Sequence, residues 1–89
     1  MMFITRWTVP HTSRKAAVQR FLETGGAPPA GVKMVARYHS SDGEFGFAIS
    51  ESDDAQALAR WAMAWNDLLV LDTRPLVNDQ GLAAVLQAP

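Results

Sequence analysis

The stretch VKMVARYHSSDGEFGFAIS, residues 32–50, decides the fold because it contains two strand patterns joined by a turn signal. Residues 32–40 and 45–51 alternate large side chains with small or polar ones, which is the period of a β-strand. Between them, Asp42-Gly43 is a strong signal for a type I′ hairpin turn. A two-residue turn places Tyr38 opposite Phe47 and Ala36 opposite Ile49.

Working outward from this hairpin, the chain predicts the order β-α-β-β-α-β followed by a short tail helix. This order is the ferredoxin-like layout, an α+β sandwich in which a four-stranded antiparallel sheet carries both helices on one side. Leu58, Trp61, Ala62 and Trp65 have helical spacing and predict the buried stripe of the second helix. We expect a single domain over residues 1–89. The predicted strands cover 2–9, 32–40, 45–51 and 68–77; the predicted helices run from Thr12 or Ser13 to about Thr24, from about Asp53 to Asn66, and over 78–86.

Composition excludes several classes of function. The chain has 89 residues, a formal net charge of −1 and no cysteine. Disulfides, thiolate catalysis and cysteine-based metal sites are therefore excluded, and the missing basic excess argues against a nucleic-acid partner. No apolar run approaches the length of a membrane span, and the N-terminus lacks a signal-peptide pattern. We expect a cytoplasmic protein with no membrane partner.

The segment GEFGFAIS, residues 43–50, is similar to the aromatic strand of an RNA-recognition motif, whose alternate aromatic side chains stack on bases. In that motif the aromatic side chains point away from the helices. Here such an arrangement would place the charged residues of the opposite face beneath the helices, where each unpaired ion costs several kcal/mol. We therefore expect the aromatic face to be the core and RNA not to be a ligand. The expected core face holds Phe3, Trp7, Val9, Met34, Tyr38, Phe45, Phe47, Ile49, Leu69 and Leu71.

On the opposite face of the sheet, the residue pattern predicts a polar trough over the small residues Gly46, Ala48 and Ser50. Ferredoxin-like domains often cover such a face by stacking two sheets in a homodimer. We expect a homodimer whose inter-sheet cavity binds a small polar or anionic organic molecule. The alternative is that the charges pair with one another or lie at a wet dimer interface. The candidate ligand-binding residues are Arg6, Arg37, His39, Asp72 and Arg74.

His39 is the candidate for a catalytic residue, because an imidazole in this trough is the kind of side chain that can act as a general acid or base. A small cofactor-independent enzyme using His39 and Arg37 is one alternative function, and a pure assembly module is another. No cofactor fingerprint is present. The acidic run 51–54 is explained by the start of a helix, so no metal site is expected.

Four stretches together resemble a family of short bacterial proteins that is known only as a domain of unknown function. The family is placed with the ferredoxin-like, dimeric α/β-barrel proteins, and the resemblance covers nearly the whole chain. It implies a homodimer and a bacterial source, but it carries over no catalytic residue. The wider group includes cofactor-free monooxygenases, isomerases and haem-handling proteins; an axial haem ligand would have to be His39. The stretches are MFITRW (2–7) with Pro10, RFLETGGAPPAGVKMVARYH (20–39), GFAISESDD (46–54) and WAMAWNDLLVLDTRPLVND (61–79).

Overall fold

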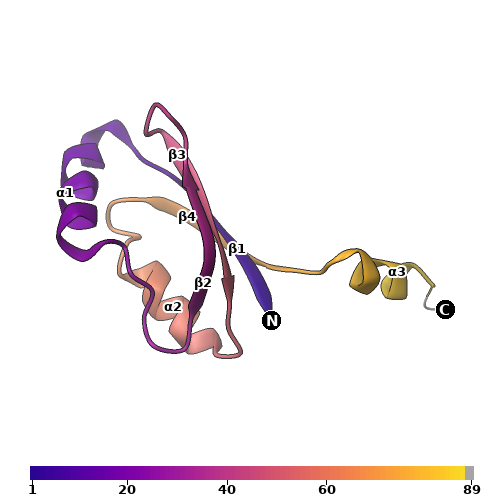
Figure 1. The fold of residues 1–89 in the computed structure, drawn as a ribbon. Helices are drawn as coiled ribbons and strands as arrows, with labels where there is room; N and C mark the ends of the chain where they lie inside the picture. The colour runs from indigo at the N-terminus through magenta and orange to yellow at the C-terminus, as the bar shows by residue number, and fades with distance from the viewer. Residues whose placement is uncertain (88–89) are drawn as a thin grey trace.

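The computed structural model describes residues 1–87 and confirms the ferredoxin-like α+β fold. Four antiparallel strands form one sheet in the order β2-β3-β1-β4. Helices α1 and α2 both cover one side of this sheet, here called the helix side, and the other side is called the open face (Figure 1). The elements are β1 (Met2–Thr8), the short 3-10 helix η1 (His11–Ser13), α1 (Arg14–Thr24), β2 (Lys33–His39), β3 (Phe45–Glu51), α2 (Ala55–Met63), β4 (Val70–Leu76) and α3 (Asp79–Gln87).

Local signals in the sequence set the helix boundaries. α1 ends at Gly25, which takes the left-handed conformation (φ 68°) that a side chain would disfavour. α2 begins after Asp54, whose carboxylate accepts hydrogen bonds from the backbone N–H groups of Gln56 and Ala57 (3.0 and 3.2 Å). The Ser13 hydroxyl donates to the Leu68 carbonyl oxygen (2.6 Å), which ties the start of α1 to the segment that enters β4.

The β2–β3 hairpin has the predicted pairing but a different turn. Tyr38 lies opposite Phe47 and Ala36 opposite Ile49, as expected. The predicted two-residue type I′ turn is wrong, because no non-glycine residue among residues 1–87 has a positive φ and only Gly43 is left-handed in the connection. The connection is instead a longer loop over residues 40–44, in which the Gly43 N–H donates to the Ser40 carbonyl oxygen (3.0 Å). A register shift between Met34 and Ala36 then bends β2.

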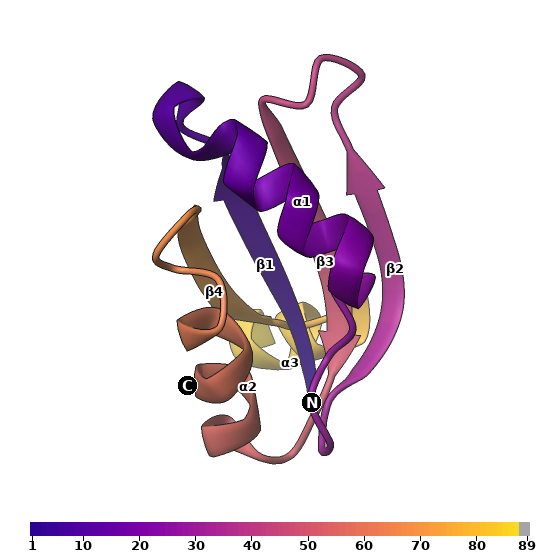
Figure 2. The same cartoon turned by 90° about the vertical axis from the view of Figure 1, so that its left-hand side faces the viewer.

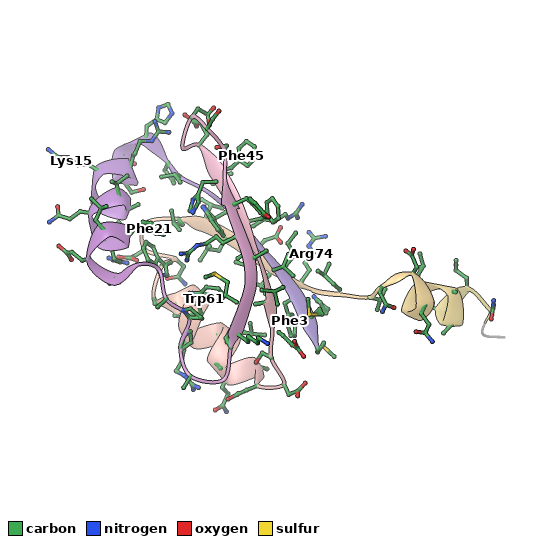
Figure 3. All side chains as sticks on the ribbon, in the orientation of Figure 1. Phe3, Lys15, Phe21, Phe45, Trp61 and Arg74 are labelled. Carbon is green, nitrogen blue, oxygen red and sulfur yellow. The ribbon has the colours of Figure 1, made fainter. Side chains whose placement is uncertain are left out.

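The prediction that the hairpin aromatic residues lie beneath the helices is wrong. β1 pairs with β3 so that Trp7 lies opposite Gly46 and Arg6 opposite Phe47. Phe45 and Phe47 therefore share the open face with Arg6. Figure 3 shows Phe45 pointing away from the helices, whereas Phe21 and Trp61 point between the helices and the sheet. Phe45 is 55% exposed and Tyr38, also on the open face, is 62% exposed.

Charge on the helix side costs less than expected because Arg37 finds hydrogen-bond partners there. Its guanidinium nitrogens donate to the carbonyl oxygens of Gly26 (2.8 Å) and Gly25 (2.9 Å) at the end of α1. The same group lies over the Phe21 ring, 5.0 Å from its centre. The interaction with carbonyls at a helix C-terminus favours a cation, so Arg37 lies there without being an unpaired buried charge.

The space between the helices and the sheet is incompletely filled. Among residues 1–87, the largest fully buried side chain is that of Ser50, and the buried apolar residues are small. Well-packed domains of this size bury several large aliphatic or aromatic side chains. The helices therefore enclose a hollow above the sheet rather than a close-packed core. The buried apolar residues are Ala17, Val32, Ala48 and Ala57.

Candidate functional site

A cavity of about 300 Å³ lies between the sheet and the two covering helices. Both layers of the fold contribute to it: α1 and α2 supply one wall and the helix side of the sheet supplies the other. Figure 2 looks onto the helices, which cross the sheet with β1 visible between them. The side chains that line the cavity and bear on its chemistry are Trp7, Arg14, Phe21, Arg37, His39, Leu58, Trp61, Trp65, Leu69 and Leu71.

Aromatic side chains form most of the cavity wall. Trp61 projects from α2, and Trp65 follows the end of that helix, so the predicted stripe does face the sheet but lines a hollow. Trp7 projects from β1 over Gly46. A Cβ atom at Gly46 would lie 2.6 Å from Cζ2 of Trp7 and 2.7 Å from the Tyr38 carbonyl oxygen, so only glycine fits beneath the indole.

The edge strand β2 gives the cavity its polar end. The His39 ring lies edge-on to Trp7 and to Phe21, with ring centres 5.8 and 5.5 Å apart. Within residues 1–87, the imidazole of His39 has no hydrogen-bond or ion-pair partner, whereas the Arg37 guanidinium is held by the backbone carbonyls at the end of α1. His39 is therefore the polar side chain here that remains available to a bound molecule.

An ion-pair cluster joins the β2–β3 loop to the start of α1 beside the cavity. Arg14, which lines the cavity, donates to the Glu44 carboxylate (2.7 Å), and His11 Nε2 lies 3.0 Å from the same oxygen. The hydrogen bond from Arg14, followed by that from His11, holds the pKa of Glu44 below its ordinary value. Sequence reasoning missed Arg14 because its partner lies 30 residues away along the chain and no local pattern connects them.

Three of the five predicted ligand-binding residues lie on the open face. Arg6 and Arg74 approach Asp72 at 2.6 and 3.5 Å, and the hydrogen bond from Arg6 is the main cause that lowers the pKa of Asp72. Arg6 and Asp72 border a hollow of about 440 Å³ that also contacts Phe45, Phe47 and other strand residues. This hollow is formed by the sheet alone, so we regard the smaller cavity, enclosed by two layers, as the better ligand site.

The predicted site therefore splits into two. Arg37 and His39 lie in the helix-side cavity, while Arg6, Asp72 and Arg74 lie together on the open face. A single inter-sheet cavity lined by all five residues is wrong, because the sheet separates the two groups. The small residues Gly46, Ala48 and Ser50 of the predicted trough are all buried on the helix side.

Two classes of site find no support in the described part of the chain. Among residues 1–87, no three His, Asp or Glu side chains are grouped so that they could hold a metal ion. In the same range, no helix has the length and apolar character needed to cross a membrane.

Comparison with known proteins identifies the fold and the family. The chain is similar to the structure of Rv0793 from Mycobacterium tuberculosis, with 13% sequence identity and a TM-score of 0.50, over 88% of this chain and 96% of that one. At this identity the similarity shows the fold alone. No curated protein matches the sequence. Over residues 1–89 the sequence matches the family described as Domain of unknown function (DUF3303), and the resemblance noted in its sequence is thereby confirmed: the chain belongs to this family.

Proposed function

We propose that the protein binds a small, largely apolar organic molecule in the helix-side cavity. The observation that carries the proposal is the cavity itself, about 300 Å³ of space walled by three tryptophans and several leucines. Ligand sites in proteins are typically apolar hollows of this order with a few polar groups that orient the ligand. Because the domain buries so few large side chains, a ligand that fills this space should add substantially to its free energy of unfolding by burying apolar surface.

The distribution of side chains favours a ring-bearing ligand with one polar or anionic group. The tryptophans favour a flat ring, because aromatic pairs gain about 0.5–1.5 kcal/mol beyond the area they bury. His39 and the cationic Arg37 lie together at the β2 end, so a carboxylate or hydroxyl would be favoured there. The polar inter-sheet ligand expected from the sequence is thus replaced by a mainly apolar ligand on the other side of the sheet.

A matched pair of variants on α2 tests the ligand site. Ala62 lines the cavity, and Ala59 is exposed on the same helix. 1-Naphthoate at 100 times its dissociation constant should stabilise the wild-type protein by about 2.7 kcal/mol. Ala62→Leu should abolish this stabilisation by filling the space, and Ala59→Leu should preserve it. Equal stabilisation of the two variants would place the ligand elsewhere, and no stabilisation by naphthoate or a library of similar aromatic acids would contradict the proposal.

His39 supports a second candidate function, a small cofactor-independent enzyme of the monooxygenase or isomerase kind. The ring is held edge-on between Trp7 and Phe21 and has no hydrogen-bond partner within residues 1–87, so its nitrogens are free to exchange a proton with a ligand. If a substrate is found, His39→Gln should retain binding while turnover falls at least about a hundredfold. Unchanged turnover would remove His39 from the reaction.

We further propose a homodimer in which the open faces of two copies stack. Phe45 and Tyr38 are largely exposed there, beside the partly buried Phe47 and Ile4, and an exposed apolar patch of this kind is typical of an interaction surface. Sheets that pack face to face bury such side chains between them. Sedimentation velocity should show a dimer at micromolar concentration, and a monomer at the highest attainable concentration would contradict this proposal.

Stacking of single-stranded RNA on the open face is the competing use of Phe45 and Phe47. Their orientation is that of an RNA-recognition motif, contrary to the arrangement expected from the sequence. The net charge of −1 supports the dimer instead, since nucleic-acid affinity depends on cationic contacts to phosphates. Labelled oligouridine should show no saturable change in anisotropy. Salt-dependent binding that Phe45→Ser abolishes would favour RNA over the dimer.

A further inference from the structure

α3 stands apart from the rest of the fold. The chain leaves β4 at Leu76 and runs to α3 on the side of the sheet opposite to α1 and α2 (Figure 1), and the perpendicular view places α3 behind the sheet (Figure 2). Its first turn is capped by Asn78, whose side-chain oxygen accepts from the Gly81 N–H (2.8 Å). Within residues 1–87, no hydrogen bond or ion pair joins α3 to another element. The segment 77–87 is called the C-terminal arm below.

The arm carries an apolar stripe with nothing covering it. Leu82, Val85 and Leu86 are 49, 65 and 74% exposed, and their spacing places them on one side of the helix. Gln80, Ala84 and Gln87 occupy the opposite side. A nine-residue helix is too short to be stable alone in water, so α3 needs a surface against its stripe.

The size of the molecule shows how much surface is left uncovered. The chain exposes 6,289 Å², whereas a folded monomer of its mass, 9.7 kDa, exposes about 5,100 Å². Its radius of gyration is 14.7 Å against about 12 Å for a compact domain of 89 residues. The surplus of about 1,200 Å² exceeds the roughly 800 Å² that each partner buries in a standard protein interface.

We propose that the C-terminal arm packs against a second copy of the chain, so that two copies exchange arms. The inference rests on the proposed homodimer and adds the occupant of the α3 stripe. Stacked sheets lie about 10 Å apart, whereas α3 alone is about 13 Å long and projects on the open side. An arm leaving β4 in this direction therefore extends past the interface to the partner. Two-fold symmetry makes the exchange reciprocal, so both stripes are covered at once.

Two matched triple variants test whether the stripe contributes to assembly. Leu82→Ser, Val85→Ser and Leu86→Ser together should raise the dimer dissociation constant at least about a hundredfold in sedimentation equilibrium. Gln80→Ser, Ala84→Ser and Gln87→Ser, on the other side of α3, should change it less than about threefold. Equal effects of the two triple variants would overturn the proposal, because helix weakening alone would then explain the loss.

A mixing experiment separates the arm from the sheet interface. The chain has no cysteine, so Ala84→Cys provides a single site for a nitroxide spin label. The labelled chain, at natural isotope abundance, is mixed with ¹⁵N-labelled wild-type chain. Arm exchange is supported if amide signals of the ¹⁵N chain become at least about twofold broader than in a mixture with unlabelled wild-type chain. A dimer without this broadening overturns the arm exchange and leaves the stacked sheets standing, whereas a monomer overturns both.

Discussion

The two faces of the sheet distribute bulk in opposite ways, and β3 shows the contrast within seven residues. Its helix-side residues, Gly46, Ala48 and Ser50, are small and buried. Its open-face residues, Phe45, Phe47 and Ile49, are large and at least partly exposed. In most half-buried strands the large side chains face the covering helices. Here the covered face has small side chains, which leave room for Trp7 and a cavity. The uncovered face has the large apolar side chains that an interface needs.

The contrast teaches that side-chain size does not by itself identify the core side of a strand. A small residue on a covered face marks a close approach by another group, as Gly46 does for the indole of Trp7. A large apolar residue on an uncovered face is typical of a surface that binds a partner. The following variants test this contrast from the largest expected effect to the smallest.

Gly46→Val should have the largest effect on stability, because it places a branched side chain on the helix side, where the neighbouring strand residues are small. Even a Cβ atom there would lie 2.7 Å from the Tyr38 carbonyl oxygen, which is backbone and cannot rotate away. We expect a loss of about 3 kcal/mol in the free energy of unfolding, measured by urea titration. Thr8→Val, on the open face of the neighbouring strand, is the control and should change stability by less than about 0.5 kcal/mol. A loss of similar size in both variants would contradict the contrast between the faces.

Replacing bulk on the open face should weaken assembly instead of folding. Phe45→Ser combined with Tyr38→Ser should raise the dimer dissociation constant about a hundredfold, equivalent to about 2.7 kcal/mol, in sedimentation equilibrium. The control is Val18→Ser with Leu22→Ser, which removes two exposed apolar side chains from α1 on the other side of the molecule. If the α1 variant dissociated the dimer equally well, the open face would not be the interface.

Two arginines on opposite faces should differ in their contribution to stability. Arg37→Gln removes the cation that bonds to the Gly25 and Gly26 carbonyls and should cost about 1–2 kcal/mol of unfolding free energy. Arg74→Gln breaks only an exposed ion pair of 3.5 Å and should cost less than about 0.5 kcal/mol. Urea titrations at protein concentrations that keep the chain monomeric provide the comparison. Equal losses would mean that the Arg37 contacts do not hold the end of α1.

The smallest effect concerns pH, and it should be seen on both faces. Ion pairs lower the pKa of Glu44 beside the cavity and of Asp72 on the open face, so each carboxylate binds its proton less readily in the folded chain than in the unfolded one. Their stabilisation is therefore complete at neutral pH and is lost as the pH falls below about 5 and through the lowered pKa values. Glu44→Gln and Asp72→Asn should be less stable than wild type at pH 7, with the difference shrinking at pH 3. A difference that does not depend on pH would contradict this.

The order of elements and the hairpin pairing could be predicted because they depend on local signals. Alternation, helical spacing and turn residues lie within a few positions of one another, and Tyr38 does pair with Phe47. Which face of the hairpin meets the helices depends instead on the register of β1 against β3, about 40 residues apart. A shift of one residue in that register exchanges the two faces completely.

The candidate site could be predicted only in part for the same reason. His39 and Arg37 do neighbour each other at a hollow, but the expected companions Arg6, Asp72 and Arg74 lie on the opposite face. Burial energy favoured the wrong face because no local pattern indicated that the carbonyls at the end of α1 would accept hydrogen bonds from Arg37. The glycine between the two phenylalanines was the available signal, because a close approach to a strand requires a residue without a side chain.

The placement of the chromophores makes the protein its own reporter. All three tryptophans line the helix-side cavity, and the one tyrosine lies across the sheet on the open face. Indole emission excited at the red edge therefore reports on the cavity, with Trp7 also bordering the open-face hollow. Energy transfer from Tyr38 depends on the distance between Tyr38 and the indoles across the sheet. Ligand binding in the cavity should change the tryptophan emission without any added dye. Docking on the open face should change the tyrosine emission first.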